Sequence, residues 1–134
     1  MTKPVFIWPV RVYYEDTDAG GVVFYANYLK FFERARTEML RAKGFEQDQL
    51  MTNTGIIFVV RTVQIDYLRS AKFNDLLQVS AEITELKKVS LIFNQEITLG
   101  QDLLCKSVIK IACLDVQSMR PKAIPENLYE QFKA

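Results

Sequence analysis

The sequence predicts an α+β fold in which an antiparallel sheet of about five strands wraps around one long helix. Apolar residues recur with the period of a helix between residues 27 and 43, and with the two-residue period of strands after residue 61. Because only one long amphipathic helix is present, it must cover the apolar face of the sheet. The chain has 134 residues, of which 49% are hydrophobic. We therefore expect one domain, residues 1–134, with a single core.

The long helix is predicted over residues 27–43. Its apolar side chains fall on one face when successive residues are set about 100° apart. These side chains are Tyr28, Phe31, Phe32, Ala35, Met39 and Ala42. Asn27 is expected as the N-cap, and Gly44 as the residue that ends the helix.

Strands are predicted on both sides of this helix. They cover residues 5–14, 62–67, 77–84, 91–99 and 103–115, most of them with the alternation of apolar and polar residues that is typical of half-buried antiparallel strands. Gly100 marks a hairpin, and a short helix is expected at 126–132. The segment 45–55 is expected to be irregular, with one helical turn at 48–51. An open sheet leaves an unpaired edge, which favours a homodimer with a continuous sheet.

Composition excludes several classes of function. The 17 basic and 16 acidic side chains give a net charge of +1, which provides no electrostatic reason to bind nucleic acid or an anionic membrane. No apolar run reaches the ~20 residues of a membrane span, and the apolar patch near the N-terminus is too short for a signal peptide. A cytoplasmic location is therefore expected.

The sequence contains no histidine, which argues against the usual zinc sites and against the imidazole base of most serine and cysteine hydrolases. Cys105 and Cys113 lie on one predicted strand, roughly 26 Å apart at ~3.3 Å per residue, so they cannot pair with each other. Both are expected to be buried free thiols. No metal and no cofactor is predicted, and any catalytic proton transfer would fall to a carboxylate or a lysine.

The residues most suited to chemistry lie between the first strand and the long helix, in the stretch Tyr13-Tyr14-Glu15-Asp16-Thr17-Asp18-Ala19-Gly20-Gly21. Asp18 is close to the helix start, whose unpaired N–H groups favour negative charge. Such donors stabilise an oxyanion, and a carboxylate opposite them can activate water or attack a carbonyl, which suits the hydrolysis of a thioester. The alternative is ordinary turn chemistry, in which aspartates bind their own loop. Turn chemistry is the preferred interpretation for Glu15 and Asp16.

This stretch and the helix after it resemble a known family. The run from Tyr13 to Val23, followed by Asn27-Tyr28 and by Phe32-Glu33-Arg34-Ala35-Arg36-Thr37-Glu38, is similar to the signature of the hot-dog acyl-CoA thioesterases of the 4-hydroxybenzoyl-CoA thioesterase class. It is most similar to the YbgC type, which is linked to the Tol-Pal envelope system. The resemblance extends from about Phe6 to Pro125. It implies the hot-dog fold, in agreement with the periodicity, and the hydrolysis of acyl-CoA.

The resemblance also implies roles for individual residues. Asp18 would be the catalytic base or nucleophile, and the backbone N–H of Tyr25 would polarise the thioester carbonyl. Glu33 corresponds to an acidic position near the acyl pocket, and Lys87 and Lys88 to a basic pair placed against the phosphates of coenzyme A. A partner subunit would contribute the substrate-binding strand Phe58, Val59, Val60, Arg61 and Thr62. The active unit is then at least a homodimer.

The chain departs from the YbgC type at Tyr25, where most members carry histidine and the hydroxybenzoyl-CoA branch carries tyrosine. Three functions stay open. They are a thioesterase for short aliphatic or aromatic acyl-CoA, a thioesterase for acyl carrier protein, and a non-catalytic acyl-binding or envelope-associated interaction protein. The acyl group, and the choice between homodimer and homotetramer, are also left open.

Overall fold

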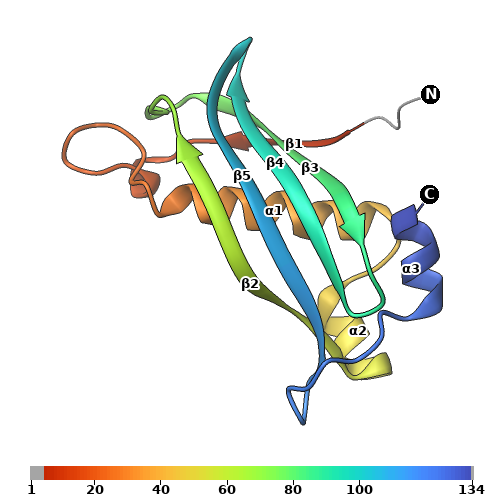
Figure 1. The fold of residues 1–134 in the computed structure, drawn as a ribbon. Coiled ribbons are helices and arrows are strands. Elements are labelled where there is room, and N and C mark those ends of the chain that lie inside the picture. The colour runs from red at the N-terminus through yellow and green to blue at the C-terminus, as the bar shows by residue number, and fades with distance from the viewer. Residues whose placement is uncertain (1–4, 134) are drawn as a thin grey trace.

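In the computed structural model, which describes residues 5–133, five strands form one antiparallel sheet around the helix α1, Asn27–Ala42 (Figure 1). The strands are β1, Phe6–Arg11; β2, Ile56–Tyr67; β3, Leu76–Leu86; β4, Ser90–Leu99; and β5, Asp102–Asp115. The short helices are η1, Tyr14–Asp16; α2, Gln47–Thr54; and α3, Glu126–Lys133. The strand order is β1-β3-β4-β5-β2. The predicted fold class is confirmed, and the ends of the predicted domain, residues 1–4 and 134, lie outside the described residues.

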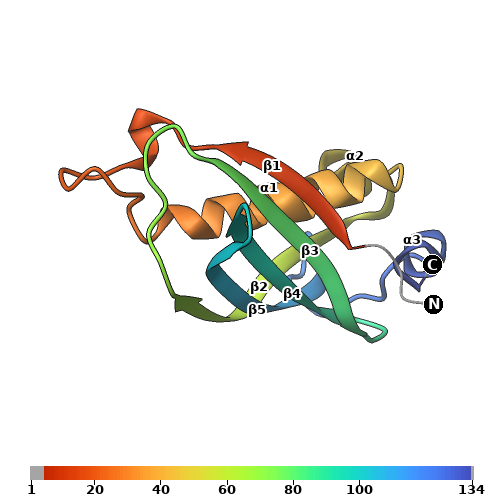
Figure 2. The ribbon, with the colours of Figure 1, turned by 90° about the horizontal axis from the view of Figure 1, so that it is seen from above.

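Helix α1 lies on the inner face of the sheet, which curls around it (Figures 1 and 2), and it contacts β1 and β3. Five of its six predicted core residues are buried: Tyr28, Phe31, Phe32, Ala35 and Met39. Burying each phenylalanine contributes roughly 1.5–3 kcal/mol. The sixth, Ala42, is exposed, so that part of the prediction is wrong. Leu40 is buried in its place, because Phe58 of β2 and Phe132 of α3 surround that side of the helix.

A buried polar side chain on β4 fixes α1 over the sheet. Gln95 is fully buried, and its Nε2 donates to the backbone oxygens of Phe32 in α1 and Ser80 in β3, at 3.0 and 3.1 Å. Its Oε1 accepts a hydrogen bond from Nη1 of Arg36 at 2.9 Å. Because an unpaired buried amide is costly, these bonds favour one position of the helix along the strands. The start of α1, next to the candidate site, is thereby held in place.

Three local predictions need correction. The first strand ends at Arg11 and not at residue 14, because the Asp16 carboxylate accepts the N–H of Tyr13 and turns the chain into η1. Asn27 is not the N-cap: Ala26 takes that position without a side-chain bond, and the Asn27 amide binds elsewhere. The expected single turn at 48–51 is the full helix α2, which Gly55 ends at φ +71°. Gly44, at φ +91°, ends α1 as predicted.

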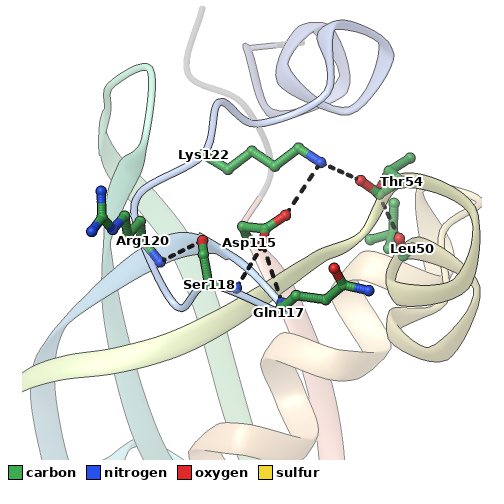
Figure 3. A network of polar contacts seen from close by, with 7 residues as sticks. All are labelled: Leu50, Thr54, Asp115, Gln117, Ser118, Arg120 and Lys122. Carbon is green, nitrogen blue, oxygen red and sulfur yellow. Dashed lines mark hydrogen bonds and ion pairs between the residues drawn. The ribbon is translucent and has the colours of Figure 1, made fainter.

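The end of β5 is tied to α2 by a polar network around Asp115 (Figure 3). Oδ2 of Asp115 accepts the backbone N–H groups of Ser118 and Gln117 at 2.8 and 3.1 Å. Nζ of Lys122 lies 3.7 Å from Asp115 Oδ1 and donates to the backbone oxygen of Thr54 at 2.8 Å. The network holds the segment after β5 against the end of α2.

We expect this network to make stability fall in acid. The N–H of Ser118, assisted by the Ser118 hydroxyl, the N–H of Gln117 and the Lys122 charge, lowers the pKa of Asp115 below its ordinary 3.8. A lowered carboxyl pKa stabilises the folded state above the ordinary value, and this stabilisation is lost as pH falls through the lowered pKa. Urea denaturation should therefore show Asp115→Asn to be less stable than wild type at pH 7, with a smaller difference at pH 3. An unchanged difference would contradict this assignment.

Candidate active site

The residues between η1 and α1 form a closed hairpin, the acidic loop, residues 17–23. The N–H of Asp18 donates to the oxygen of Val22 at 2.9 Å, and Thr17 and Val23 form an isolated antiparallel bridge. Gly21, at φ +81°, makes the turn that a side chain would strain. The N–H of Val23 also donates to Ala71 in the segment between β2 and β3. The loop is thus a defined structure, and it projects at the start of α1 (Figure 1).

Asp18 is exposed within this loop, and its two carboxylate oxygens differ. Oδ1 accepts the N–H of Gly20 at 2.8 Å, which is the turn chemistry that the sequence left as the alternative. The second oxygen, Oδ2, has no hydrogen-bond donor among residues 5–133. One oxygen therefore fixes the orientation of the carboxylate, and the other is available to water or substrate. The turn interpretation holds for Asp16, whose buried carboxylate binds the N–H of Tyr13, and Glu15 is exposed.

Backbone donors are available just before α1. Among residues 5–133, nothing accepts a hydrogen bond from the N–H of Tyr25 or of Ala26, whereas the N–H of Phe24 donates to Asp16 and that of Asn27 to Phe24. Unpaired N–H groups at a helix start carry partial positive charge and suit an anion or a polarised carbonyl. The donor predicted at Tyr25 is therefore present and free.

Aromatic rings surround these donors on the side of α1 that faces β2. The Tyr25 ring meets the Tyr67 ring edge-on at 6.1 Å, and the Tyr67 ring lies 5.5 Å from that of Tyr28. Burial, with smaller contributions from Cys105 and neighbouring tyrosines, raises the pKa of Tyr67, and burial also raises the pKa of Tyr28. Both phenols are therefore neutral at physiological pH. The half-exposed rings of Phe24, Tyr25 and Tyr67 form an apolar wall beside the free N–H groups.

The predicted substrate-binding strand lies in β2, an edge strand of the sheet. Phe58 and Val60 pair with Cys113 and Ile111 of β5, which face the core, so both point to the inner face. Val59 and Thr62 point to the outer face, and a bulge lies between Val60 and Thr62, at Arg61. Phe58 packs against Phe132, and Val60 is 44% exposed. The strand has no second strand beyond it among residues 5–133.

One chain does not bring all the predicted residues together. Lys87 and Lys88 lie in the turn after β3. Strand β3 begins at the end of the sheet that lies next to the acidic loop, and it runs away from that end for 11 residues, roughly 30 Å. The lysine pair is therefore far from Asp18 of the same chain. The Lys88 oxygen accepts the N–H of Ile124, which places the turn against the segment before α3. Glu33 is exposed on α1, four residues after the exposed Leu29. The lysine pair can meet Asp18 only if a second chain supplies one of them.

The site is open in a single chain. A hollow of about 600 Å³ lies on the outer face of the sheet, lined by polar residues such as Gln64, Glu82 and Lys106, and by neither Asp18 nor Tyr25.

Within residues 5–133, no three His, Cys, Asp or Glu side chains are grouped as a metal site requires, and no helix is long and apolar enough to cross a bilayer. The polar groups that this region offers to a substrate are the Asp18 carboxylate, the free N–H groups before α1 and the phenols of Tyr25 and Tyr67.

Sequence reasoning missed two contributors to this region. The sequence predicts Tyr67 only as an apolar position in a strand, although its place at the end of β2 brings it to the helix start. The sequence predicts Asn27 as a helix cap, whereas its side chain donates to the backbone oxygen of Asp16, eleven residues earlier. The alternation of β2 could have indicated Tyr67. Nothing in the local sequence indicates the partner of Asn27.

The chain is a member of the thioesterase superfamily, since the model of that family matches residues 20–106. It is similar to the acyl-CoA thioesterase YbgC of Haemophilus influenzae, with 48% identity over 95% of this chain and 93% of the relative. It is also similar to the acyl-CoA thioester hydrolase YbgC of Escherichia coli, with 45% identity over 99% of both. Among solved structures, it resembles a probable thioesterase from Bartonella henselae, with a TM-score of 0.87 and 34% identity over 91% of this chain and 100% of that one. The predicted family is confirmed.

Proposed function

We propose that this chain hydrolyses acyl-CoA thioesters, with Asp18 as base or nucleophile and the Tyr25 N–H as oxyanion donor. The observation that carries the proposal is that the acidic loop connects two groups without partners among residues 5–133. One is Oδ2 of Asp18, which has no donor, and the other is the set of N–H groups at the start of α1, which have no acceptor. The names of the YbgC relatives support acyl-CoA as the substrate.

The chemistry follows from these groups. Asp18 accepts a proton from a water that attacks the thioester carbonyl, or attacks the carbonyl itself and is released by water in a second step. The carbonyl oxygen gains negative charge, which the Tyr25 N–H stabilises. The C–S bond then breaks, and the sulfur leaves as a thiolate. Because an ordinary thiol has a pKa of about 8.5, this leaving group needs little protonation, which suits a site without histidine.

We further propose that the active unit is a homodimer joined along β2. β2 is a 12-residue edge strand without proline, whereas the opposite edge, β1, has six residues and contains Pro9. Val60, Val63 and Tyr67 leave apolar surface exposed along the inner face of β2. Pairing two β2 strands would cover this surface and would bring Phe58 to Thr62 of one chain towards the open site of the other.

A cytoplasmic location is part of the same proposal, supported by the two free cysteines.

The test is the release of free thiol from a panel of CoA esters, from short aliphatic to aromatic acyl groups, and from the same acyl groups carried by acyl carrier protein. Thiol release from one class of CoA ester supports the proposal. Thiol release from acyl carrier protein alone would show that the substrate is acyl carrier protein and not acyl-CoA. Binding of acyl-CoA without thiol release would instead identify a non-catalytic acyl-binding protein.

The protein's own cysteines should not disturb this assay. Both are buried, and burial raises the pKa of Cys105 to about 12 and of Cys113 to about 11. Since the thiolate is the reactive form, neither should react at neutral pH in the folded protein. Ellman's reagent should detect no thiol in the native protein and two per chain in 6 M guanidinium chloride, which corresponds to the two cysteines of the sequence. Rapid labelling of native protein would show that the core around β5 opens readily.

A further inference from the structure

The buried side chain of Asn27 joins α1 directly to the backbone just before the acidic loop. Nδ2 of Asn27 donates to the backbone oxygen of Asp16 at 2.9 Å, and Asn27 is 8% exposed. The same oxygen accepts the N–H of Phe24, also at 2.9 Å. The residue just before the loop and the residue just after it are therefore joined at one atom.

Asp16 is itself held on its other side. Its carboxylate is buried, accepts the N–H of Tyr13 at 2.8 Å, and forms no ion pair with a residue from 5 to 133. The carboxylate thus faces back towards β1, while the backbone oxygen faces forward to α1. Any shift of that oxygen moves the first residue of the loop, and with it Asp18, relative to the N–H of Tyr25.

The Asn27 amide has no role within its own helix. It makes no capping bond, although asparagine beside a helix start usually caps the first N–H groups. Its Nδ2 instead reaches a partner eleven residues earlier. The site it stabilises is therefore the junction between the loop and α1, and only a donor can serve there, because the partner is a carbonyl oxygen.

We propose that Asn27 is a positioning residue for thioester hydrolysis, which sets the separation between the Asp18 carboxylate and the Tyr25 N–H by holding the Asp16 backbone oxygen. The inference rests on the proposed function of Asp18 and Tyr25. Both groups act on the same carbonyl, so a small change in their separation affects the transition state more than substrate binding. A misplacement of about 1 Å can lower a rate about 100-fold.

The test is the kinetics of Asn27→Ala on the CoA ester that the wild-type protein hydrolyses best. We expect kcat to fall about 10- to 100-fold, with KM within about threefold of wild type. Asn27→Ser keeps a shorter donor, and its kcat should lie between the two. The matched control is Thr54→Ala, which also removes one hydrogen bond from a side chain to the backbone, here to Leu50 in α2, at the opposite end of α1 from the acidic loop. It should keep the wild-type kcat.

Each outcome decides the proposal. A wild-type kcat in folded Asn27→Ala overturns it, as does a loss that Thr54→Ala shares to the same extent. A rise in KM with unchanged kcat also overturns it, because Asn27 would then serve binding. If Asn27→Ala does not fold, Asn27→Ser decides by the same criteria. Failure of the proposed function is separate: the wild type would then release no thiol, or Asp18→Asn would be as active as wild type.

Discussion

Asp18→Asn should lower the rate of acyl-CoA hydrolysis by about 10²- to 10⁴-fold without unfolding the protein. Asparagine has the shape of aspartate, and its side-chain oxygen can still accept the N–H of Gly20, which Asp18 accepts at 2.8 Å. The acidic loop therefore keeps its conformation. The neutral amide can neither take a proton from water nor attack the thioester, so the chemical step loses its base or nucleophile. The measurement is thiol release under saturating CoA ester, with circular dichroism to verify the fold.

Glu15→Gln is the matched control for this variant. Glu15 is exposed, lies three residues earlier, and loses the same charge on substitution. If Asp18 acts through its position and not through the overall charge of the loop, Glu15→Gln should keep its rate within about twofold, since exposed substitutions away from a site have small effects. Asp18→Asn with an undiminished rate on every CoA ester would remove the catalytic assignment and leave only the fold.

The periodicity of the sequence was sufficient for the fold because most of the core depends on local spacing. Phe31, Phe32 and Ala35 fall on one helical face whatever packs against them, and they are fully buried. The beginning of β2 was not predicted, and the reason is physical. The run before Val60 is continuously apolar, and the bulge at Arg61 adds one residue and shifts the alternation, so the pattern becomes regular only from Thr62.

The candidate site was only partly predictable. Asp18 and Tyr25 lie close together in the chain, so one sequence motif can include both. The spacing and the family resemblance propose Asp18, and the resemblance proposes the Tyr25 N–H. Asn27 and Asp16 interact over eleven residues, and the same asparagine in another fold would be a helix cap. Lys87 and Lys88 would need a second chain to meet Asp18, and a sequence pattern does not report the geometry of an assembly.

The proposed homodimer leads to the second large effect: if it forms along β2, Val63→Lys should convert it to monomers at micromolar concentration. Val63 points to the inner face of β2 and is 39% exposed in the single chain, so a lysine there should change the stability of the monomer by less than about 0.5 kcal/mol. In a dimer joined along β2, one lysine from each chain would be buried in the interface. Burying unpaired charges costs several kcal/mol, which weakens association by two orders of magnitude or more.

Sedimentation velocity over a range of concentrations measures this effect, and Gln64→Lys is its control. Gln64 is the next residue along the strand, points to the outer face, and adds the same charge, so that variant should stay dimeric. Because the partner would supply part of each site, the activity of Val63→Lys should fall with the dimer and recover as protein concentration rises. A wild-type protein that is monomeric and fully active at nanomolar concentration would contradict the shared site. Lys87 and Lys88 would then take no part in the site that contains Asp18, because one chain does not bring them together.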